Sequence, residues 1–425
     1  MRVGIHKIDI TPEEPVWLTG YADRDHKSEG VYAPLHGGAI YLEGGHDRAL
    51  ILTADVIGFS PPADAETRSA LADVTGLLPR QIVLTATHTH CAPFFSPWIM
   101  PGREEPGYRA FLIAQLQKAA LQAMATATAG RIGMSRGHSA FGVNRRRPDG
   151  EDGVLFAPHP EGPIDRDLDT LWLYGEADQL IGSLTVYGCH PTSLSGYDVG
   201  PDYPGFLCRR LAEQSGAPAL FATGCAGDIR PWFGGRPADT FPRPDLEELI
   251  QGGESMADEA MLGRSEERTV DAEEMKIDHI VHRLPYDRRM TVEELRATAA
   301  GGDPWLKTWA QLMLEQRAHG EPADACPHEI QVLQLSPDLR AVFLGGEILS
   351  EIGLHIKQVL SPATTISVAY SNGLIAYVPS ANAHPLGGYE VDGSHHYFRR
   401  PARFTAEAES LIVEQTQALV ARLES

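Results

Sequence analysis

Two histidines stand two positions apart in the segment TATHTHCAP, residues 85–93. The run QIVLTA before them is apolar and β-branched, so we expect a strand over 81–90 that directs His88 and His90 to the same face. Neutral imidazole is the commonest metal ligand in proteins. The pair therefore indicates either a metal site or two hydrogen-bonded structural histidines.

Other apolar runs also end in polar or acidic residues where the chain leaves the predicted sheet. Asp55 follows RALILTA, His190 follows SLTVYGC, Asp228 follows FATGCAG, and Glu347 follows AVFLGG. The carboxyl ends of strands form the binding crevice of open α/β sheets, where side chains from separate strands converge. Singly, His190 could be a structural histidine and Glu347 an acid that stabilises a helix N-terminus. Jointly, these strand ends predict one site.

Strand-like runs alternate with helical stretches along the chain. This alternation predicts an α/β layered sandwich, with central mixed β-sheets flanked by helices and the site at the carboxyl ends of the strands. No linker is evident, so we expect a single domain over 1–425, with an elaborated side lobe or lid around 235–330. Strands are expected over 48–59, 81–90, 180–191, 217–231 and 365–379, a strand and helix over 341–360, and helices near 63–76, 106–128, 304–318 and 405–423, with a capping box at Thr291 and Glu294.

The composition limits the classes of partner. The chain has 425 residues, 43% of them hydrophobic, and a formal net charge of −21. Such an acidic chain repels nucleic-acid phosphates and anionic lipids. The N-terminus does not read as a signal peptide, no apolar run approaches the roughly 20 residues of a membrane span, and the cysteines lack zinc-ribbon spacing. We expect a cytoplasmic protein with a small-molecule substrate, without nucleic-acid or membrane partners; a homo-oligomer is compatible with the sequence.

Two segments offer groups that could bind a substrate. In the glycine-rich turn GCAGDIRP (224–231), the guanidinium of Arg230 could hold a carboxylate, a phosphate or two sugar hydroxyls, or form a salt bridge to Asp228 or Asp202. The basic segment SHHYFRRPARF (394–404) could bind an anionic or polyhydroxyl substrate, form a solvated face or contact another subunit. The substrate-binding candidates are Arg230, Asp228, Asp202, His395, His396 and Arg399.

A series of short motifs extends in order along nearly the whole chain. They are DITP (9–12), LTGYADR (18–24), TAD (53–55), TATHTHCAP (85–93), NRR (144–146), GCHPTSLS (188–195), DYPG (202–205), GCAGDIRP (224–231), GGE (345–347) and YSNGLIAYVPS (370–380), followed by Tyr389. In this order and composition the sequence resembles the catalytic domain of the neutral/alkaline (non-lysosomal) ceramidase family. The resemblance implies a divergent, short bacterial-type member of the family, which we expect to lack the C-terminal immunoglobulin-like domain.

The resemblance implies amide-bond hydrolysis with a bound Zn²⁺. The zinc ligands of the family correspond to His88, His190, Glu347 and Tyr377. Its catalytic residues correspond to His90, Arg145 and Tyr389. From these roles, zinc is expected to activate a water molecule for attack on a carbonyl carbon, while Tyr389 and Arg145 donate to the developing oxyanion and His90 holds or moves the proton of the water.

The sequence departs from the family at positions near the expected site. Arg230 stands where the family has a serine or threonine, DYPG replaces DNKG, and Cys91 replaces the serine after THTH. We therefore expect a zinc-dependent hydrolase that acts on the amide (N-acyl) bond of a small soluble substrate rather than on a lipid. Two alternatives stay open: a zinc-dependent carbohydrate-active enzyme, either a glycoside hydrolase or a lyase, and a metal-binding protein without catalysis.

Overall fold

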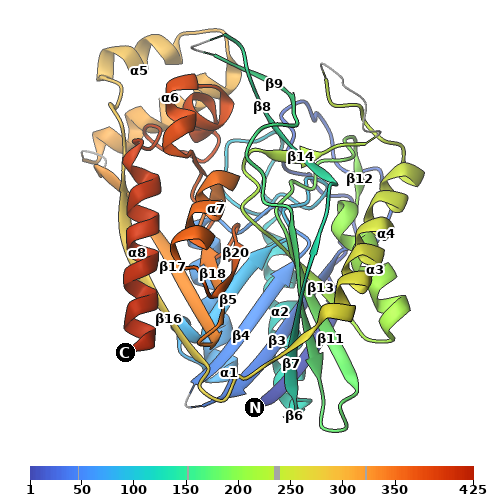
Figure 1. The fold of residues 1–425 in the computed structure, drawn as a ribbon. Coiled ribbons are helices and arrows are strands. Elements are labelled where there is room, and N and C mark those ends of the chain that lie inside the picture. The colour runs from blue at the N-terminus through green and yellow to red at the C-terminus, as the bar shows by residue number, and fades with distance from the viewer. Residues whose placement is uncertain (46, 151–152, 234–239, 321–322) are drawn as a thin grey trace.

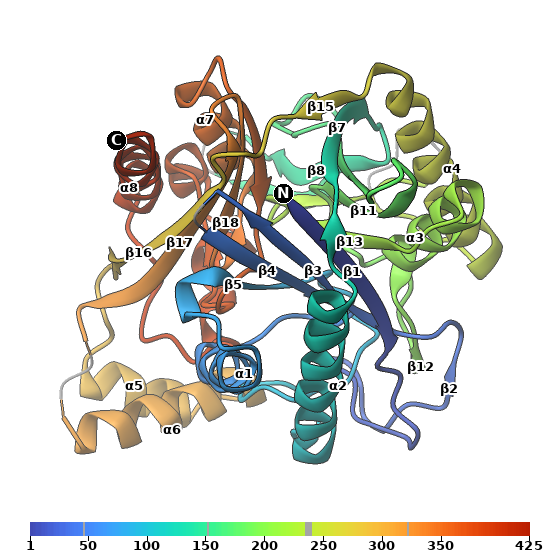
Figure 2. The same ribbon diagram turned by 90° about the horizontal axis from the view of Figure 1, so that it is seen from below.

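The computed structural model describes residues 1–45, 47–150, 153–233, 240–320 and 323–425. Its main body consists of three mixed sheets that surround a common core, with helices on the outside (Figures 1 and 2). Each of the three sheets is antiparallel apart from one parallel pair of strands. The predicted α/β class, with mixed sheets flanked by helices, is confirmed.

The first sheet has the strand order β5-β4-β3-β1-β6 and is covered on its outer face by α1 and α2 (Figure 2). Buried leucines such as Leu52 on the sheet and Leu116 on α2 pack together there. The elements are β1 (Arg2–Asp9), β3 (His36–Gly44), β4 (Asp47–Ala54), β5 (Ile82–Ala86), β6 (Thr128–Ala129), α1 (Pro61–Thr75) and α2 (Pro106–Ala125).

The second sheet has the order β13-β11-β10-β7-β15, and α3 and α4 cover its outer face. Trp172 and Phe221 of the sheet are buried together with Leu207 of α3 and Ala257 of α4. The elements are β7 (Arg131–His138), β10 (Asp167–Tyr174), β11 (Leu180–Tyr187), β13 (Ala219–Thr223), β15 (Arg268–Val270), α3 (Asp202–Ser215) and α4 (Leu246–Gly263).

The third sheet has the order β16-β17-β18-β20, with α7 and α8 on its outer face. Ile352 of α7 and Ile412 of α8 belong to the same buried cluster as Val332 and Val342 of the sheet. The elements are β16 (Lys276–Pro285), β17 (Ala325–Ser336), β18 (Leu339–Leu344), β20 (Thr364–Val368), α7 (Ser350–Val359) and α8 (Glu407–Glu424).

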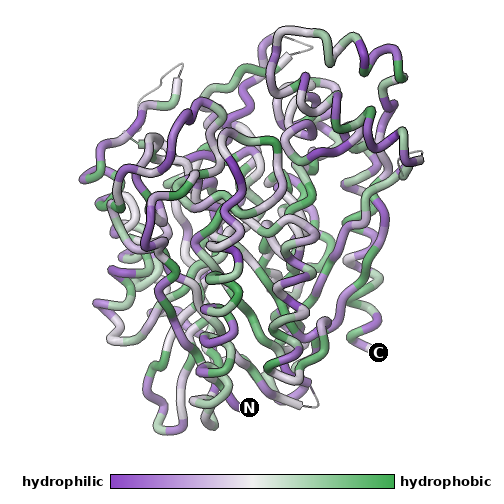
Figure 3. The backbone as a smooth tube through the Cα atoms, turned by 180° about the vertical axis from the view of Figure 1, so that it is seen from behind, coloured by the Kyte–Doolittle hydropathy of each residue, from purple (hydrophilic) through white to green (hydrophobic). Residues whose placement is uncertain are grey.

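The inner faces of the three sheets share one apolar core. Ile51 of β4, Leu184 of β11 and Leu333 of β17 are buried in the same cluster. Coloured by hydropathy, the central strands are mostly hydrophobic, whereas the outer helices alternate between the two kinds of residue (Figure 3). Because all three sheets pack against this shared core, the core also fixes the relative positions of their strand ends.

Short pairings cap one end of this body. They are β2 (Gly30–Val31) with β12 (Asp198–Val199), β8 (Gly142–Pro148) between β9 (Val154–His159) and β14 (Ile229–Pro231), and β19 (Glu347–Ile348) with β21 (Tyr377–Val378). In Figure 1, β8, β9 and β14 lie at the top of the molecule. These small sheets join the loops that follow the main strands.

Much of the range 235–330, predicted to form a side lobe, belongs to the main layers. Its helix α4 covers the second sheet, and β16 pairs within the third. The excursion proper is the helix pair α5 (Val292–Ala299) and α6 (Pro304–Ala318), which has its own small apolar cluster. Residues 235–239 and 321–322 of the predicted lobe lie outside the described residues.

The predicted helices are found at nearly their expected places, and two details are informative. The capping box before α5 is confirmed: Thr291 Oγ accepts from Glu294 N at 3.2 Å, and Thr291 N donates to the Glu294 carboxylate at 2.7 Å. The strands predicted over 48–59 and 81–90 end earlier, at Ala54 and Ala86. Among the described residues, no helix combines the length and apolar character that a membrane crossing requires.

Candidate metal centre

Each of the three main sheets delivers one predicted metal ligand to the same point. His88 follows β5 of the first sheet, His190 follows β11 of the second, and Glu347 begins β19 just beyond β18 of the third. Tyr377 begins β21 and is the direct register partner of Glu347. The four side chains are buried, with exposed residue fractions of 1%, 0%, 3% and 6% in this order.

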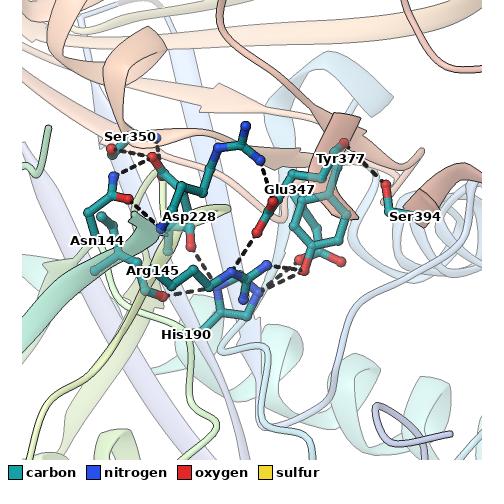
Figure 4. Close-up of polar contacts among 12 residues, drawn as sticks. Asn144, Arg145, His190, Asp228, Glu347, Ser350, Tyr377 and Ser394 are labelled. Atoms are coloured by element: carbon teal, nitrogen blue, oxygen red, sulfur yellow. Dashed lines mark hydrogen bonds and ion pairs between the residues drawn. The ribbon is translucent and has the colours of Figure 1, made fainter. Parts of the chain in front are cut away.

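The donor atoms of these residues lie in direct contact. The Glu347 Oε2 atom is 3.2 Å from His88 Nε2 and 3.0 Å from His190 Nε2. The Tyr377 hydroxyl is 3.1 Å from His190 Nε2. Figure 4 shows His190, Glu347 and Tyr377 converging from separate parts of the chain. A fifth residue, His90, places its Nε2 atom 3.3 Å from that of His88.

The hydrogen bonds of the rings determine which nitrogen faces the centre. His88 Nδ1 lies 2.5 Å from the carbonyl oxygen of Ile57, and His190 Nδ1 lies 2.5 Å from that of Ala226. A carbonyl only accepts, so both rings donate through Nδ1 and present the lone pair of Nε2 inward. There the lone pairs meet the Glu347 carboxylate, which is also an acceptor. A cation at this point satisfies all three groups.

The spacing and charge of the donors fit a metal ion. A tetrahedral ion with bonds of about 2.0 Å separates its ligand atoms by about 3.3 Å, close to the contacts above. Burial, followed by the charge of Arg145, lowers the pKa of His190 to about 4. Burial would raise the pKa of Glu347, but His88 and His190 hold it well below its usual value. At neutral pH the His190 ring is therefore neutral and the Glu347 carboxylate is ionised, as metal binding requires.

The local backbone of His88 differs from the expected strand. The strand β5 ends at Ala86, and His88 has a φ of 68°, in the left-handed region. Its backbone N–H donates to the carbonyl of Val56 at 2.9 Å. The segment at His88 therefore binds the loop after β4 and does not extend the strand pairing of β5. The prediction that His88 and His90 share a strand face is wrong, although their rings do meet. A left-handed non-glycine residue costs roughly 1–3 kcal/mol and commonly marks a functional turn.

A buried cluster of Arg145, Arg146 and Glu390 contacts the hydroxyl of Tyr377 through Arg145. Arg145 on β8 donates through Nη2 to the Tyr377 hydroxyl at 3.1 Å and through Nε to Glu390 at 2.7 Å. Arg146 donates to the second oxygen of the Glu390 carboxylate. Burial raises the pKa of Glu390, but Arg145 and Arg146 outweigh this effect and lower it. The Nε and Nη2 groups of Arg145 thus bind Glu390 and Tyr377.

A narrow cavity opens onto the donor cluster. His90, Glu347, Tyr377 and Tyr389 form its polar part. The Tyr389 ring is 5.5 Å from the Tyr377 ring, and 42% of the residue is exposed. The other lining residues are mostly apolar or aromatic: Gly20, Ile57, Trp98, Met100, Leu374, Tyr397 and Phe398.

Comparison with known proteins identifies solved structures that share this architecture. The sequence matches no protein-family model. Among solved structures, the neutral ceramidase from Pseudomonas aeruginosa superposes with a TM-score of 0.75 at 19% identity, covering 99% of this chain and 74% of that one. A ceramidase complexed with C2 superposes with a TM-score of 0.74 at 17% identity, covering 99% and 75%. The chain has the neutral ceramidase fold. The resemblance seen in the motifs is confirmed at the level of the fold.

Within this ceramidase-like fold, two predicted substrate-binding acids are engaged by the protein itself. Asp228 accepts from the backbone N–H of Ser350 at 2.7 Å and from Asn144 Nδ2 at 2.8 Å, so it ties α7 to β8 (Figure 4). Asp202 accepts from the backbone N–H and the hydroxyl of Ser193 at 2.8 and 2.6 Å. These contacts suit carboxylates that fix the loops around the metal centre.

The segment 394–404 lines the cavity with Tyr397 and Phe398, while its predicted substrate-binding residues His395, His396 and Arg399 lie beside the cavity. The rings of His395 and His396 pack on Trp309 of α6, with ring centroids 5.7 and 4.4 Å away. Arg399 donates to the Pro97 carbonyl at 3.1 Å and lines a neighbouring surface cavity. Trp98 and Met100 line both cavities, which are therefore adjacent.

Arg230 lies on β14 next to β8 of the metal centre. Its Nη2 donates to the Thr192 carbonyl at 3.2 Å, two residues after His190. Its guanidinium lies 5.5 Å from the Phe156 ring and 5.2 Å from the Phe241 ring.

Sequence reasoning missed Glu390, Arg146 and Tyr370. Glu390 follows Tyr389, and Arg146 completes the NRR motif, but nothing local indicates that the acid and both arginines meet in the interior. The Tyr370 ring packs 4.1 Å from the His88 ring, and its hydroxyl is buried without a hydrogen-bond partner among the described residues. The available signals were weak: Arg146 and Tyr370 belong to motifs of the series, and Glu390 only follows Tyr389.

Proposed function

We propose that this protein is a zinc-dependent hydrolase that cleaves the amide (N-acyl) bond of a small soluble substrate. Zinc would be held by His88, His190, Glu347 and Tyr377. The observation that carries the proposal is the convergence of these buried donors, with inward lone pairs, at the floor of a cavity. Nitrogen and oxygen ligands of this kind suit zinc.

The protein groups around the ion have distinct tasks. When bound, zinc lowers the pKa of water toward neutrality and polarises a carbonyl oxygen. Burial, followed by the charge of His88, holds the pKa of His90 well below its usual value, so its cavity-facing ring is neutral and can accept a proton. Tyr389 has a hydroxyl that can donate to a developing oxyanion. Arg145 acts as a positioning residue, because it holds the Tyr377 hydroxyl.

The character of the cavity favours an acyl compound over a sugar. A sugar ring presents hydroxyls on every edge and needs a lining rich in hydrogen-bonding groups. Here Ile57, Trp98, Met100 and Leu374 face the space beside the donor cluster. An acyl chain fits such a lining, and the structural neighbours of the chain are ceramidases. The narrow cavity and Arg230 in place of the family hydroxyl favour a small polar substrate over ceramide.

The proposal is tested by supplying the zinc-loaded protein with three substrate panels: short N-acyl amides, long-chain ceramide in detergent, and oligosaccharides. Free amines and new reducing or unsaturated sugar ends are measured by mass spectrometry. We expect amine release from short N-acyl compounds, abolished by His190→Ala and by chelation, and negligible release from ceramide. Sugar cleavage without amine release would instead support the carbohydrate-active alternative.

A further inference from the structure

Arg230 lies close to the metal centre without an ion-pair partner among the described residues. Among the described residues, its guanidinium has one hydrogen-bond acceptor, the Thr192 carbonyl, and no carboxylate within salt-bridge distance. The two acids predicted as its partners accept hydrogen bonds from other groups: Asp228 from Ser350 and Asn144, and Asp202 from Ser193, although the charge of Asp202 still raises the pKa of Arg230. A structural salt bridge therefore does not explain why an arginine stands here.

The surroundings raise the cost of this charge. The guanidinium lies against the rings of Phe156 and Phe241, which themselves meet edge to face at 5.6 Å. Burial and the nearby cations Arg145 and Arg243 lower its pKa. A partly dehydrated guanidinium with unused N–H groups is an unfavourable arrangement in isolation and a favourable one once an anion is bound. The unused N–H groups of Arg230 suit a planar acceptor that forms two parallel hydrogen bonds.

Two chains of contacts connect Arg230 to the metal centre. The Phe156 ring is shared with Arg145, whose guanidinium is 5.3 Å from it and whose Nη2 donates to Tyr377. On another side, the charge of Arg230 acts on the hydroxyl of Tyr21, and the Tyr21 ring packs 5.1 Å from the His90 ring. Along each route two side chains lie between Arg230 and a predicted zinc ligand: Phe156 and Arg145 before Tyr377, and Tyr21 and His90 before His88.

From this arrangement we propose that Arg230 binds a carboxylate of the substrate, so that the substrate is an anionic N-acyl compound of the N-acyl amino acid class. The inference rests on the proposed amide hydrolysis and adds the substrate class. The apolar cavity beside Tyr389 receives the acyl chain, and the guanidinium between Phe156 and Phe241 receives the carboxylate of the amine portion. The scissile amide then lies between them, at the donor cluster.

The test compares matched acid and ester substrates. Amide hydrolysis is measured as kcat/KM for N-acetyl amino acids and for their methyl esters, which lack the negative charge and carry one added methyl group. The wild type should prefer the acids. Loss of the anchor in Arg230→Gln should reduce kcat/KM for the acids by roughly 10- to 100-fold and leave a much smaller effect on the esters. Arg230→Lys keeps the charge but loses the planar guanidinium. Its kcat/KM for the acids should therefore lie between those of the wild type and Arg230→Gln.

Arg264→Gln is the matched control. Its guanidinium also lies over an aromatic ring, 4.9 Å from Trp172, but it is paired with Glu267 at 3.6 Å. It should leave the preference for acids intact. An equal fall on acids and esters in Arg230→Gln, or no fall on either, overturns the assignment.

Binding measurements separate this assignment from the proposed function. If the wild type cleaves neither substrate, the hydrolase proposal fails, while calorimetric titration of the protein with N-acetyl amino acids and with a simple uronic acid still tests the anion site. Binding of the N-acetyl amino acid that is lost in Arg230→Gln supports the site. Equal binding by wild type and variant, or binding of the uronic acid alone, overturns it.

Discussion

Replacing Glu390 by glutamine tests whether the residues behind Tyr377 position the metal centre. Glu390 forms ion pairs with two arginines in the interior, and the side chains of Glu390, Arg145 and Arg146 are 3%, 5% and 7% exposed. Glutamine keeps the shape of the side chain but removes the charge and places an amide N–H₂ against one guanidinium. Breaking a buried ion pair in this way costs about 3–5 kcal/mol of unfolding free energy.

The same substitution should weaken the metal site through Arg145. The guanidinium that donates to Tyr377 at 3.1 Å is itself oriented by Glu390 at 2.7 Å. Loss of an orienting partner outside the ligands typically reduces metal affinity by roughly 10- to 100-fold, about 1.4–2.8 kcal/mol. Urea unfolding of the metal-free protein gives the stability change, and competition with a zinc chelator gives the affinity.

A matched control separates the two effects. Asp169 is also buried and accepts from Arg136 at 2.6 and 2.9 Å, but it shares no partner with Tyr377. Asp169→Asn should lower stability by a comparable amount and leave zinc affinity unchanged. If both variants lose zinc affinity to the same extent, or if Glu390→Gln retains full affinity, Glu390 has no positioning role.

Two further perturbations follow from the structure. Burial lowers the pKa of His328 to about 3 and that of its partner His282 to about 4, so their contribution to stability is full above pH 6.5 and is lost as the pH falls toward these values. The urea midpoint should drop between pH 7.5 and 4.5, and by less in His328→Gln; an unchanged drop would contradict this. Gly346 has a φ of +121°, and an added Cβ would lie 2.9 Å from the Ala376 carbonyl, so Gly346→Ala should displace Glu347 and weaken zinc binding in the chelator assay. Gly302→Ala, where an added Cβ meets nothing within 4 Å, should not; equal zinc affinity in both variants would refute the reasoning.

The position of the site was predictable because strand ends carry a local signal. His190 and Glu347 stand directly after apolar runs, and the carboxyl ends of strands from all three sheets meet at one end of the core. Asp55 has the same signal but accepts from the backbone N–H of His36 and lies in a different cavity. A strand end therefore indicates the edge of a sheet, while the packing of the sheets decides which ends meet.

Other features of the site depend on long-range contacts that no local pattern encodes. Tyr377 reads as a core residue, and only the family resemblance singled it out. Glu390 is more than 240 positions from Arg145, so their pairing is a product of the fold. The left-handed turn at His88 is likewise imposed by tertiary contacts, because a threonine-flanked histidine after an apolar run has the local propensity of a strand. Several strands, including β1, β7, β16 and β17, were not predicted. The edge strand β16 carries the charged residues Lys276, Asp278 and Arg283, which obscure the alternation.

Metal analysis of the purified protein tests the central claim most directly. After loading with zinc and dialysis, mass spectrometry should find about one zinc per chain in the wild type, as expected for a single tetrahedral site. His88→Ala and His190→Ala should each retain only a small fraction of it, with circular dichroism confirming that the variants are folded. Full zinc content in both folded variants would contradict the assignment of the metal centre.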